Sequence, residues 1–414
     1  MTVSVDRWPV VPRKVVLESA ADIVVIGGGV AAHRCVFELR RRGYVGRLTL
    51  ISQEQHLPYD RTLVSKDMIE HGRSSDPVSL CSAEEYASAG IAVHLGVTAT
   101  ALDLASRSLA LSDGTSKSYD RLVLCVGGRP LLPASLCAPG VILVRDADSA
   151  VRLREALIPG RHLAIIGGGF IGGEVATTAL ERGVHVTMVE AENQPLQSVF
   201  GAKVGERLAT LHRQSGVTLH CGATAEQVIR DESGFQIWTA NGQIIHADDL
   251  VVGVGMTPDV AWLQESGLQL DGGVVTDETG RSSDDHVFAA GDCAKWWHAR
   301  SRELRKIEHW DTASRHGACV AASVLGTSET FDPLPFFWSE QHGVKFQWAG
   351  YRSHFDDVTL EEERDSHTFA ARFFTDGRIE SVLAAGQPRR FAQMRRELLH
   401  ATTSIEGKSD VNAV

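Results

Sequence analysis

Short apolar runs followed by glycines recur along the chain, and they predict its first structural elements. The first folded segment is expected to begin near Ala20, where the sequence reads ADIVVIGGGVAAHRCVFELRRRG over 21–43. The run 23–26 is short and β-branched, as in a buried parallel strand. The glycines predict a turn, the next residues a helix, and 47–52 a second strand. Such a βαβ unit implies a right-handed crossover and a parallel sheet.

The same order of elements returns at 161–190, which reads RHLAIIGGGFIGGEVATTALERGVHVTMVE. The two copies lie about 140 residues apart, which is too long a period for a solenoid and favours two separate domains. From about Asp332 the pattern changes. Prolines and tryptophans appear, and the alternation at 368–374 predicts antiparallel strands in a third, α+β domain. The polar tail after about Thr402 is expected to be loose.

Each glycine turn has the spacing of a dinucleotide-binding fingerprint. The first is Gly27-x-Gly29-x-x-Ala32, and the second is Gly167-x-Gly169-x-x-Gly172. The first glycine permits a tight turn and the second a close approach to a pyrophosphate, while a small third residue lets helix and strand pack closely. The helix N-terminus then offers free N–H groups to the phosphates. A lone fingerprint would be weak evidence, but a doubled strand–turn–helix context predicts two dinucleotide sites.

The residue that ends the second strand of each unit bears on which nucleotide binds. In the second unit it is Glu190, 23 residues after Gly167. A carboxylate there accepts hydrogen bonds from a ribose 2′-OH and repels a 2′-phosphate, which predicts NADH over NADPH. The first unit reads Ile51-Ser52-Gln53-Glu54, without an acid at the usual position, so Glu54 is the candidate ribose ligand.

Charge and cysteine usage exclude several classes of function. The net charge of −11 over 414 residues argues against a general nucleic-acid binder, although basic clusters occur at 300–306 and 389–396. No stretch approaches the ~18 apolar residues that span a bilayer, and a cytoplasmic location is expected. The seven cysteines are scattered without a CxxC pair, which argues against an iron–sulfur cluster, a structural zinc or a redox dithiol.

Several longer stretches resemble a known family. GRSSDDHVFAAGDCA (280–294) is similar to the second FAD motif of glutathione-reductase-like flavoproteins, in which the Asp of Gly291-Asp292 binds the ribityl chain. LPYDRTLVSK (57–66), YDRLVLCVGGRP (119–130), IEHWDTASRHGACVAASVLG (307–326) and FFWSEQHGVKFQWAGY (336–351) resemble segments of the putidaredoxin, rubredoxin and biphenyl-dioxygenase ferredoxin reductases. Thr62 and Leu63 depart from the usual Pro-Pro, and Val126 departs from the usual Thr.

The resemblance covers roughly 20–400 and implies an α/β fold with two Rossmann-like domains and a C-terminal α+β interface domain. The implied FAD domain comprises 20–130 and 258–328, the NAD domain 131–257, and the interface domain 329–402. The residues implied to hold FAD are Gly27, Gly29, Ala32, Glu54, Arg61, Lys66, Gly127, Asp292 and Trp310. Those implied to hold NAD are Gly167, Gly169, Gly172, Glu190 and Gly255.

The resemblance also implies the residues nearest the chemistry. Lys66 is implied to pair with Glu174 of the second fingerprint helix, and we hypothesise that this ion pair lies at the flavin–nicotinamide junction. Trp310 and Trp338 are candidates for the flavin edge and the acceptor surface, with a buried structural role as the alternative. His309 is expected to cap or pack, because hydride transfer needs no proton abstraction by histidine.

The implied activity is that of an NADH-dependent ferredoxin reductase that serves a cytochrome P-450 or a Rieske-type oxygenase. Two alternatives stay open: an NADH oxidase or nitrite-reductase component, and an AIF-like redox-responsive interaction flavoprotein. Disulfide reductases of the superfamily carry a cysteine pair beside the flavin, where this chain has 61–66 and no cysteine. Thiol–disulfide exchange is therefore not expected. A ferredoxin is usually acidic, so the basic clusters at 300–306 and 389–396 are candidate docking surfaces.

Overall fold

The computed structural model describes residues 21–69, 76–299, 303–327, 329–351, 354–362 and 367–406. They fall into two compact units. The first holds the described residues up to Asp60 together with Pro77–Arg129 and Thr257–Pro333. The second holds Arg61–Asp76, Pro130–Met256 and the described residues from Leu334 onward. The domain boundaries expected from the sequence, after 130, 257 and 328, stay a prediction.

A five-stranded parallel sheet forms the centre of the first unit, in the order β18-β7-β1-β2-β3. Its strands are β1 (Asp22–Ile26), β2 (Arg47–Ser52), β3 (Ile91–Leu95), β7 (Arg121–Leu124) and β18 (Val287–Ala289). All five residues of β1 are buried, because the strand has a neighbour on each side and a covered face above and below. The predicted βαβ unit and its parallel sheet are confirmed.

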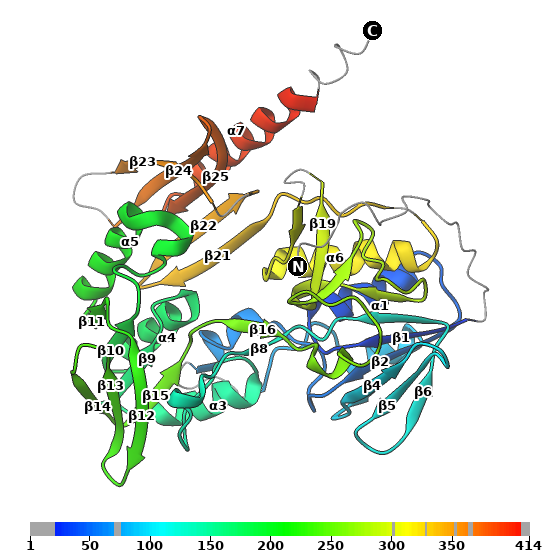
Figure 1. The fold of residues 1–414 in the computed structure, drawn as a ribbon, viewed down its shortest axis with the longest axis horizontal. Helices are drawn as coiled ribbons and strands as arrows, with labels where there is room; N and C mark the ends of the chain where they lie inside the picture. Colours follow the sequence, from blue (N-terminus) through cyan, green and yellow to red (C-terminus); the bar gives the residue numbers. More distant parts are fainter. Residues whose placement is uncertain are drawn as a thin grey trace. The chain divides into compact units, whose positions relative to one another are not determined.

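The two faces of this sheet are covered by different elements. Helices α1 (Val30–Arg41) and α6 (Trp310–Val324) lie side by side and share one hydrophobic cluster with Ile23 and Val25 (Figure 1). Val24 and Ile26 point to the other cluster, which includes residues of the antiparallel strands β4 (Ala99–Asp103) and β5 (Ser108–Leu111). The remaining elements of the unit are α2 (Ala83–Ser88), β6 (Ser116–Ser118), β17 (Val274–Thr276), β19 (Ala294–His298) and β20 (Glu303–Arg305).

The second unit contains a four-stranded parallel sheet in the order β11-β10-β9-β15. Its strands are β9 (His162–Ile166), β10 (His185–Glu190), β11 (Thr218–Cys221) and β15 (Asp249–Val252). Helix α4 (Phe170–Glu181) connects β9 to β10, as the second glycine turn predicted. The other elements of this part are α3 (Ala147–Ala156), α5 (Gln197–Gln214) and the antiparallel strands β12 (Ala225–Asp231), β13 (Gly234–Thr239) and β14 (Ile244–Ala247).

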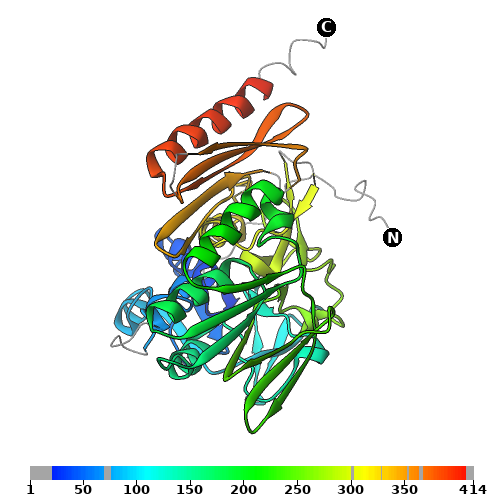
Figure 2. The ribbon, with the colours of Figure 1, turned by 90° about the vertical axis from the view of Figure 1, so that its left-hand side faces the viewer.

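A second, antiparallel sheet of the same unit has the order β21-β22-β25-β24-β23. Its strands are β21 (Phe336–Gln341), β22 (Val344–Gly350), β23 (Asp357–Glu362), β24 (Phe369–Thr375) and β25 (Arg378–Ala385). Apolar residues of α5 pack on one face, and those of α7 (Pro388–Glu406) pack on the other (Figure 2). The predicted antiparallel C-terminal domain is confirmed, but α7 continues to Glu406, so the chain does not become loose at Thr402.

Two short strands, β8 (Gly128–Pro130) and β16 (Met256–Pro258), pair with each other where the chain passes from one unit to the other. Within the described part of the chain, no helix has the length and hydropathy to cross a bilayer.

Candidate functional site: two glycine cradles and a buried ion pair

The first glycine turn follows β1 in a conformation that only glycine adopts without strain. Gly27 has φ +131°, and a Cβ there would lie 2.0 Å from the carbonyl oxygen of Cys125 at the end of β7. Its N–H donates to the carbonyl of Ile51 in β2 at 2.8 Å. The turn is therefore held between the two strands that flank β1, and any side chain at this position would force them apart.

Helix α1 begins at this turn with its first N–H groups available. Among the described residues, no side chain caps the helix at Gly29, and its first turn holds no acid. Ala32 is completely buried, and Gly317 of α6 comes so close that a Cβ would lie 2.1 Å from the Ala31 carbonyl oxygen. A cap-free helix start that follows a glycine turn fits a pyrophosphate, because N–H groups and the helix dipole both favour an anion.

The Gly-Asp turn of the second FAD motif lies after β18 in the same unit. Gly291 has φ +76° and begins a short 3-10 helix, η6 (Gly291–Cys293), that includes Asp292. The N–H of Gly291 donates to Nδ1 of His316 at 3.3 Å. This hydrogen bond requires that Nδ1 carry no proton. Burial lowers the pKa of His316 to about 3, so it remains an acceptor at neutral pH. The strand and turn predicted around Asp292 are thus present in the unit that holds the first cradle.

Glu190 ends β10 in the second unit, and Ser52 occupies the corresponding place at the end of β2 in the first. A Cβ at Gly28 would lie 2.2 Å from Oγ of Ser52, just as one at Gly168 would lie 2.9 Å from Oε2 of Glu190. Glu54 lies two residues further on and accepts a hydrogen bond from Tyr59 Oη at 2.7 Å. Its contact with an FAD ribose stays a prediction.

The second glycine turn repeats the geometry of the first. Gly167 has φ +108°, and a Cβ there would lie 2.3 Å from the carbonyl oxygen of Gly253, which follows β15. A Cβ at Gly172 would lie 2.2 Å from the Gly167 carbonyl oxygen, so α4 packs against the turn more closely than alanine allows. At Gly169, by contrast, a Cβ would meet nothing within 4 Å. The helix starts there without a side-chain cap or a first-turn acid among the described residues, which again fits a pyrophosphate.

Glu190 ends β10 beside this turn, and its carboxylate is fixed by backbone donors. Oε2 accepts the N–H of Gly168 at 2.7 Å, and Oε1 accepts the N–H of Glu192 at 2.7 Å. Each carboxylate oxygen has a second lone pair, so the group can still accept from a ribose hydroxyl. The geometry fits the predicted preference for NADH, which stays a prediction.

Lys66 and Glu174 form the ion pair that the resemblance implied. Lys66 Nζ lies 2.8 Å from Oε2 of Glu174, and the two side chains are 23% and 4% exposed. Both residues belong to the second unit, with Glu174 on α4 one helical turn after the glycine cradle. Ser65 Oγ donates to the same oxygen at 2.5 Å. The position of this pair at a flavin–nicotinamide junction stays a prediction.

The remaining predicted cofactor residues lie on turns and helix ends. Arg61 donates to the carbonyl of Arg145 at 3.4 Å, within the second unit. Gly127 and Gly255 have φ +68° and +119°, and both carbonyl groups accept backbone hydrogen bonds. Trp310 is the first residue of α6 and is partly buried. Their contacts with FAD or NAD stay predictions.

Trp338, a candidate for the flavin edge or the acceptor surface, and His309, expected to cap a helix or to pack, lie in different environments. Trp338 lies on β21 and stacks on Phe336, with ring centroids 5.9 Å apart. His309 occupies the N-cap position of α6, and its pKa is lowered to about 4 by burial.

All seven cysteines are free thiols. Burial raises the pKa of Cys35 and of Cys293 to about 12, which keeps both as unreactive thiols at neutral pH.

The two basic clusters differ in how much of each is described. Residues 300–302 lie outside the described part of the chain, while Lys306 pairs with Glu308 at 2.6 Å. In the 389–396 cluster, Arg390 pairs with Glu361 at 2.5 Å, and Arg395 lies over the ring of Phe336. Acidic partners therefore offset part of the positive charge, which the linear sequence does not reveal.

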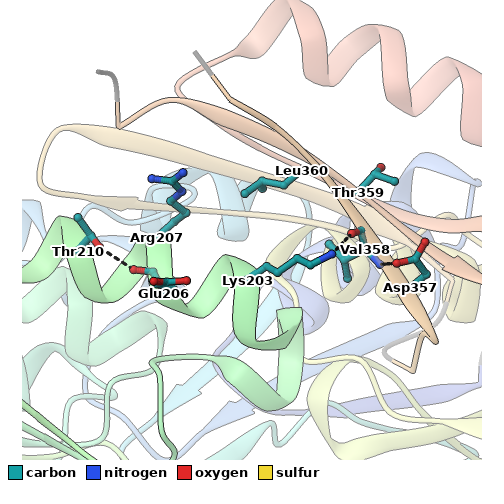
Figure 3. A pocket seen from close by; sticks show the side chains of 8 residues that line it. All are labelled: Lys203, Glu206, Arg207, Thr210, Asp357, Val358, Thr359 and Leu360. Atoms are coloured by element: carbon teal, nitrogen blue, oxygen red, sulfur yellow. Dashed lines mark hydrogen bonds between the residues drawn. The ribbon is translucent and has the colours of Figure 1, made fainter. Parts of the chain in front are cut away.

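A surface hollow of the second unit lies between α5 and the edge strand β23 (Figure 3). Lys203 reaches across it and donates to the carbonyl of Val358 at 3.1 Å. A lysine on the open carbonyl of an edge strand opposes pairing with another strand. The hollow contains none of the predicted cofactor residues.

Comparison with known proteins agrees with this arrangement. The family described as pyridine nucleotide-disulphide oxidoreductase matches residues 21–317, and the family described as reductase C-terminal matches 336–412. The ferredoxin–NAD(+) reductase subunit of a benzene 1,2-dioxygenase system from Pseudomonas putida is 34% identical over 94% of each chain. Rhodocoxin reductase from Rhodococcus erythropolis is 32% identical, over 91% of this chain and 89% of the relative. Among solved structures, the covalent putidaredoxin reductase–putidaredoxin complex matches with a TM-score of 0.86 and 27% identity, over 91% of this chain and 93% of that one.

Proposed function

Because the chain belongs to the pyridine nucleotide-disulphide oxidoreductase family, we propose that it is an FAD-dependent reductase that oxidises NADH and reduces an iron–sulfur ferredoxin. The observation that carries this proposal is the pair of glycine cradles. Each has a positive-φ glycine against a neighbouring strand and a helix start without a side-chain cap. Relatives of the same length that are named as ferredoxin reductases support the choice of acceptor.

The family resemblance and the fold class expected from the sequence are confirmed, and the cofactors FAD and NAD(H) are those of this family. When bound, FAD accepts a hydride from a reduced nicotinamide and passes the electrons on singly. In this proposal the protein holds the two dinucleotides, and a competing disulfide route is not expected because the segment 61–66 carries no cysteine. The ferredoxin would serve a cytochrome P-450 or a Rieske-type oxygenase, as the names of the relatives suggest. The cytoplasmic location stays a prediction.

Lys66 is the residue that we assign to the flavin side of the electron transfer. A cation held by a buried carboxylate would stabilise the negative charge that develops on a reduced flavin. Lys66→Met should slow flavin bleaching by NADH at least about tenfold in anaerobic stopped-flow measurements. Lys117→Met is a matched control, since Lys117 is also ion-paired, to Asp22 at 3.1 Å, and is 30% exposed. If both variants reduce the flavin at the wild-type rate, the assignment is wrong.

The acceptor is tested by steady-state reduction of cytochrome c with NADH, with and without an added ferredoxin. We expect strong dependence on the ferredoxin. Rapid oxygen consumption without ferredoxin would instead identify an NADH oxidase. Slow turnover with a long-lived charge-transfer complex would identify a redox-responsive interaction protein.

A further inference from the structure

The Glu174 carboxylate has a different set of donors on each of its two oxygens. Lys66 Nζ and Ser65 Oγ both contact Oε2, at 2.8 and 2.5 Å. Ser339 Oγ donates to Oε1 at 2.8 Å. Ser339 is only 1% exposed, so water cannot replace its hydroxyl without a rearrangement. The orientation of the carboxylate plane is therefore set by Lys66 on one side and Ser339 on the other.

Gln341 fixes the direction of the Ser339 hydrogen bond. Its Nε2 donates to Ser339 Oγ at 3.2 Å, and the side chain is buried. A hydroxyl has a single proton, so Ser339 that accepts from Gln341 must give that proton to Glu174. A Cβ at Gly173 would lie 2.3 Å from Oε1 of Gln341, so glycine at this point of α4 makes room for the amide. The amide, the hydroxyl and the carboxylate thus form one ordered chain.

The packing of β21 along α4 brings Ser339 and Glu174 together. Phe337 packs on Phe170 at the start of α4, with ring centroids 4.7 Å apart. Two residues further along the strand, Ser339 meets Glu174, four residues further along the helix. A strand repeats its face every two residues and a helix every three to four, so contacts recur along both elements. Strand β21 therefore lies along the helix that starts at the second glycine cradle.

We propose that Ser339 is a positioning residue for the Lys66–Glu174 pair. It holds Oε1 of Glu174, so that Oε2 alone faces Lys66, and it thereby links the C-terminal sheet to the dinucleotide-binding helix. This inference rests on the proposed function, in which Lys66 acts beside the flavin. Without the Ser339 hydroxyl, one buried carboxylate oxygen would have no donor among the described residues, and rotation of the carboxylate would move Oε2 away from Lys66.

The test compares two serines that bond to the same carboxylate. Ser339→Ala leaves two donors on Oε2 and none on Oε1, whereas Ser65→Ala leaves one donor on each oxygen. In anaerobic stopped-flow measurements with NADH, Ser339→Ala should lower the limiting rate of flavin bleaching about tenfold. Its Kd for NADH should change less than about twofold, because the residues of the glycine cradle are untouched. Ser65→Ala should lower the limiting rate clearly less than Ser339→Ala does, because Lys66 still contacts Oε2 and Ser339 still donates to Oε1.

Two further variants keep the test decisive. Ser339→Thr retains the hydroxyl and should restore most of the limiting rate. Ser339→Cys fills the site with a slightly larger thiol that is only a weak donor, so it should be slow even if the alanine variant folds poorly. A limiting rate for Ser339→Cys and Ser339→Ala within twofold of wild type would overturn the proposal, and so would an equal fall in Ser65→Ala. If wild-type protein itself failed to bleach with NADH, the proposed function would be at fault instead.

Discussion

Gly169→Ala separates the binding role of the second glycine cradle from its structural role. The residue has φ −77° and ψ −170°, which alanine adopts readily, and a Cβ there would meet nothing within 4 Å. The same methyl group would occupy the space through which we expect a pyrophosphate to approach the helix N-terminus. The substitution should therefore leave the fold intact and weaken the binding of NADH.

The allowed backbone conformation sets the expected change in stability, and the lost phosphate contact sets the expected change in the Kd for NADH. Replacing glycine in an allowed conformation stabilises a protein by roughly 0.4–1 kcal/mol, because the unfolded chain loses freedom. A hydrogen bond to a charged group contributes about 1.5–3 kcal/mol, so loss of one phosphate contact should raise the Kd for NADH about 10- to 100-fold. Gly172→Ala is the contrasting variant. Its Cβ would lie 2.2 Å from the Gly167 carbonyl oxygen, so it should destabilise the fold by about 1–3 kcal/mol.

The assay combines urea unfolding with anaerobic stopped-flow reduction at several NADH concentrations. The first gives the free energy of unfolding, and the second gives the Kd for NADH and the limiting rate of flavin bleaching. Gly169→Ala should raise the Kd for NADH without lowering either the free energy of unfolding or the limiting rate of flavin bleaching. A variant with wild-type stability and a wild-type Kd would show that no phosphate approaches this turn, and the assignment of the second cradle to NADH would be refuted.

Three further predictions concern specificity, docking and pH. Glu190→Ala removes the carboxylate at the end of β10. It should raise the ratio of kcat/KM for NADPH to that for NADH at least about tenfold. An unchanged ratio would show that Glu190 does not select between the two nucleotides. Arg389→Glu with Arg396→Glu should slow reduction of an acidic ferredoxin, most at low salt, but leave ferricyanide reduction unchanged; equal effects on both acceptors would exclude a docking role. His342 contacts His212 at 2.9 Å between ring nitrogens, and burial lowers the pKa of His342 from 6.5 to about 4. The unfolded chain thus binds more protons between these values, so the free energy of unfolding should fall as pH drops from 6.5 to 4, by up to about 1.4 kcal/mol per pH unit for this histidine. Denaturant titrations at several pH values should show a shallower fall for His342→Gln, and an identical fall would contradict this reasoning.

Local patterns predicted the parts of the site that are continuous in the sequence. Both cradles follow from a strand, three glycines and a helix within about 20 residues, and the structure places Gly27 and Gly167 in equivalent turns. Glu190 could be recognised because it ends the strand that follows the helix. The Lys66–Glu174 pair was reached only through family resemblance, because the two residues are separated by more than 100 positions.

The supporting contacts could not be predicted from one sequence. Ser339 and Glu174 are 165 residues apart, and a serine in a strand carries no local signal that it will meet a buried carboxylate. The same holds for the basic cluster near the C-terminus, where Arg390 is paired with Glu361, 29 residues away. The loose tail was expected to start too early, at about Thr402, because a polar composition does not by itself end a helix, and α7 extends to Glu406.

We propose that two electrons enter the protein from NADH and leave one at a time to an iron–sulfur protein. Anaerobic double mixing measures both steps: the flavoprotein is first reduced with one equivalent of NADH and is then mixed with a panel of oxygenase-type ferredoxins that includes putidaredoxin. We expect at least one ferredoxin to reoxidise the flavin, with two ferredoxins reduced for each NADH consumed. If every ferredoxin stays oxidised while oxygen rapidly reoxidises the flavin in a parallel aerobic mix, the protein is not a ferredoxin reductase.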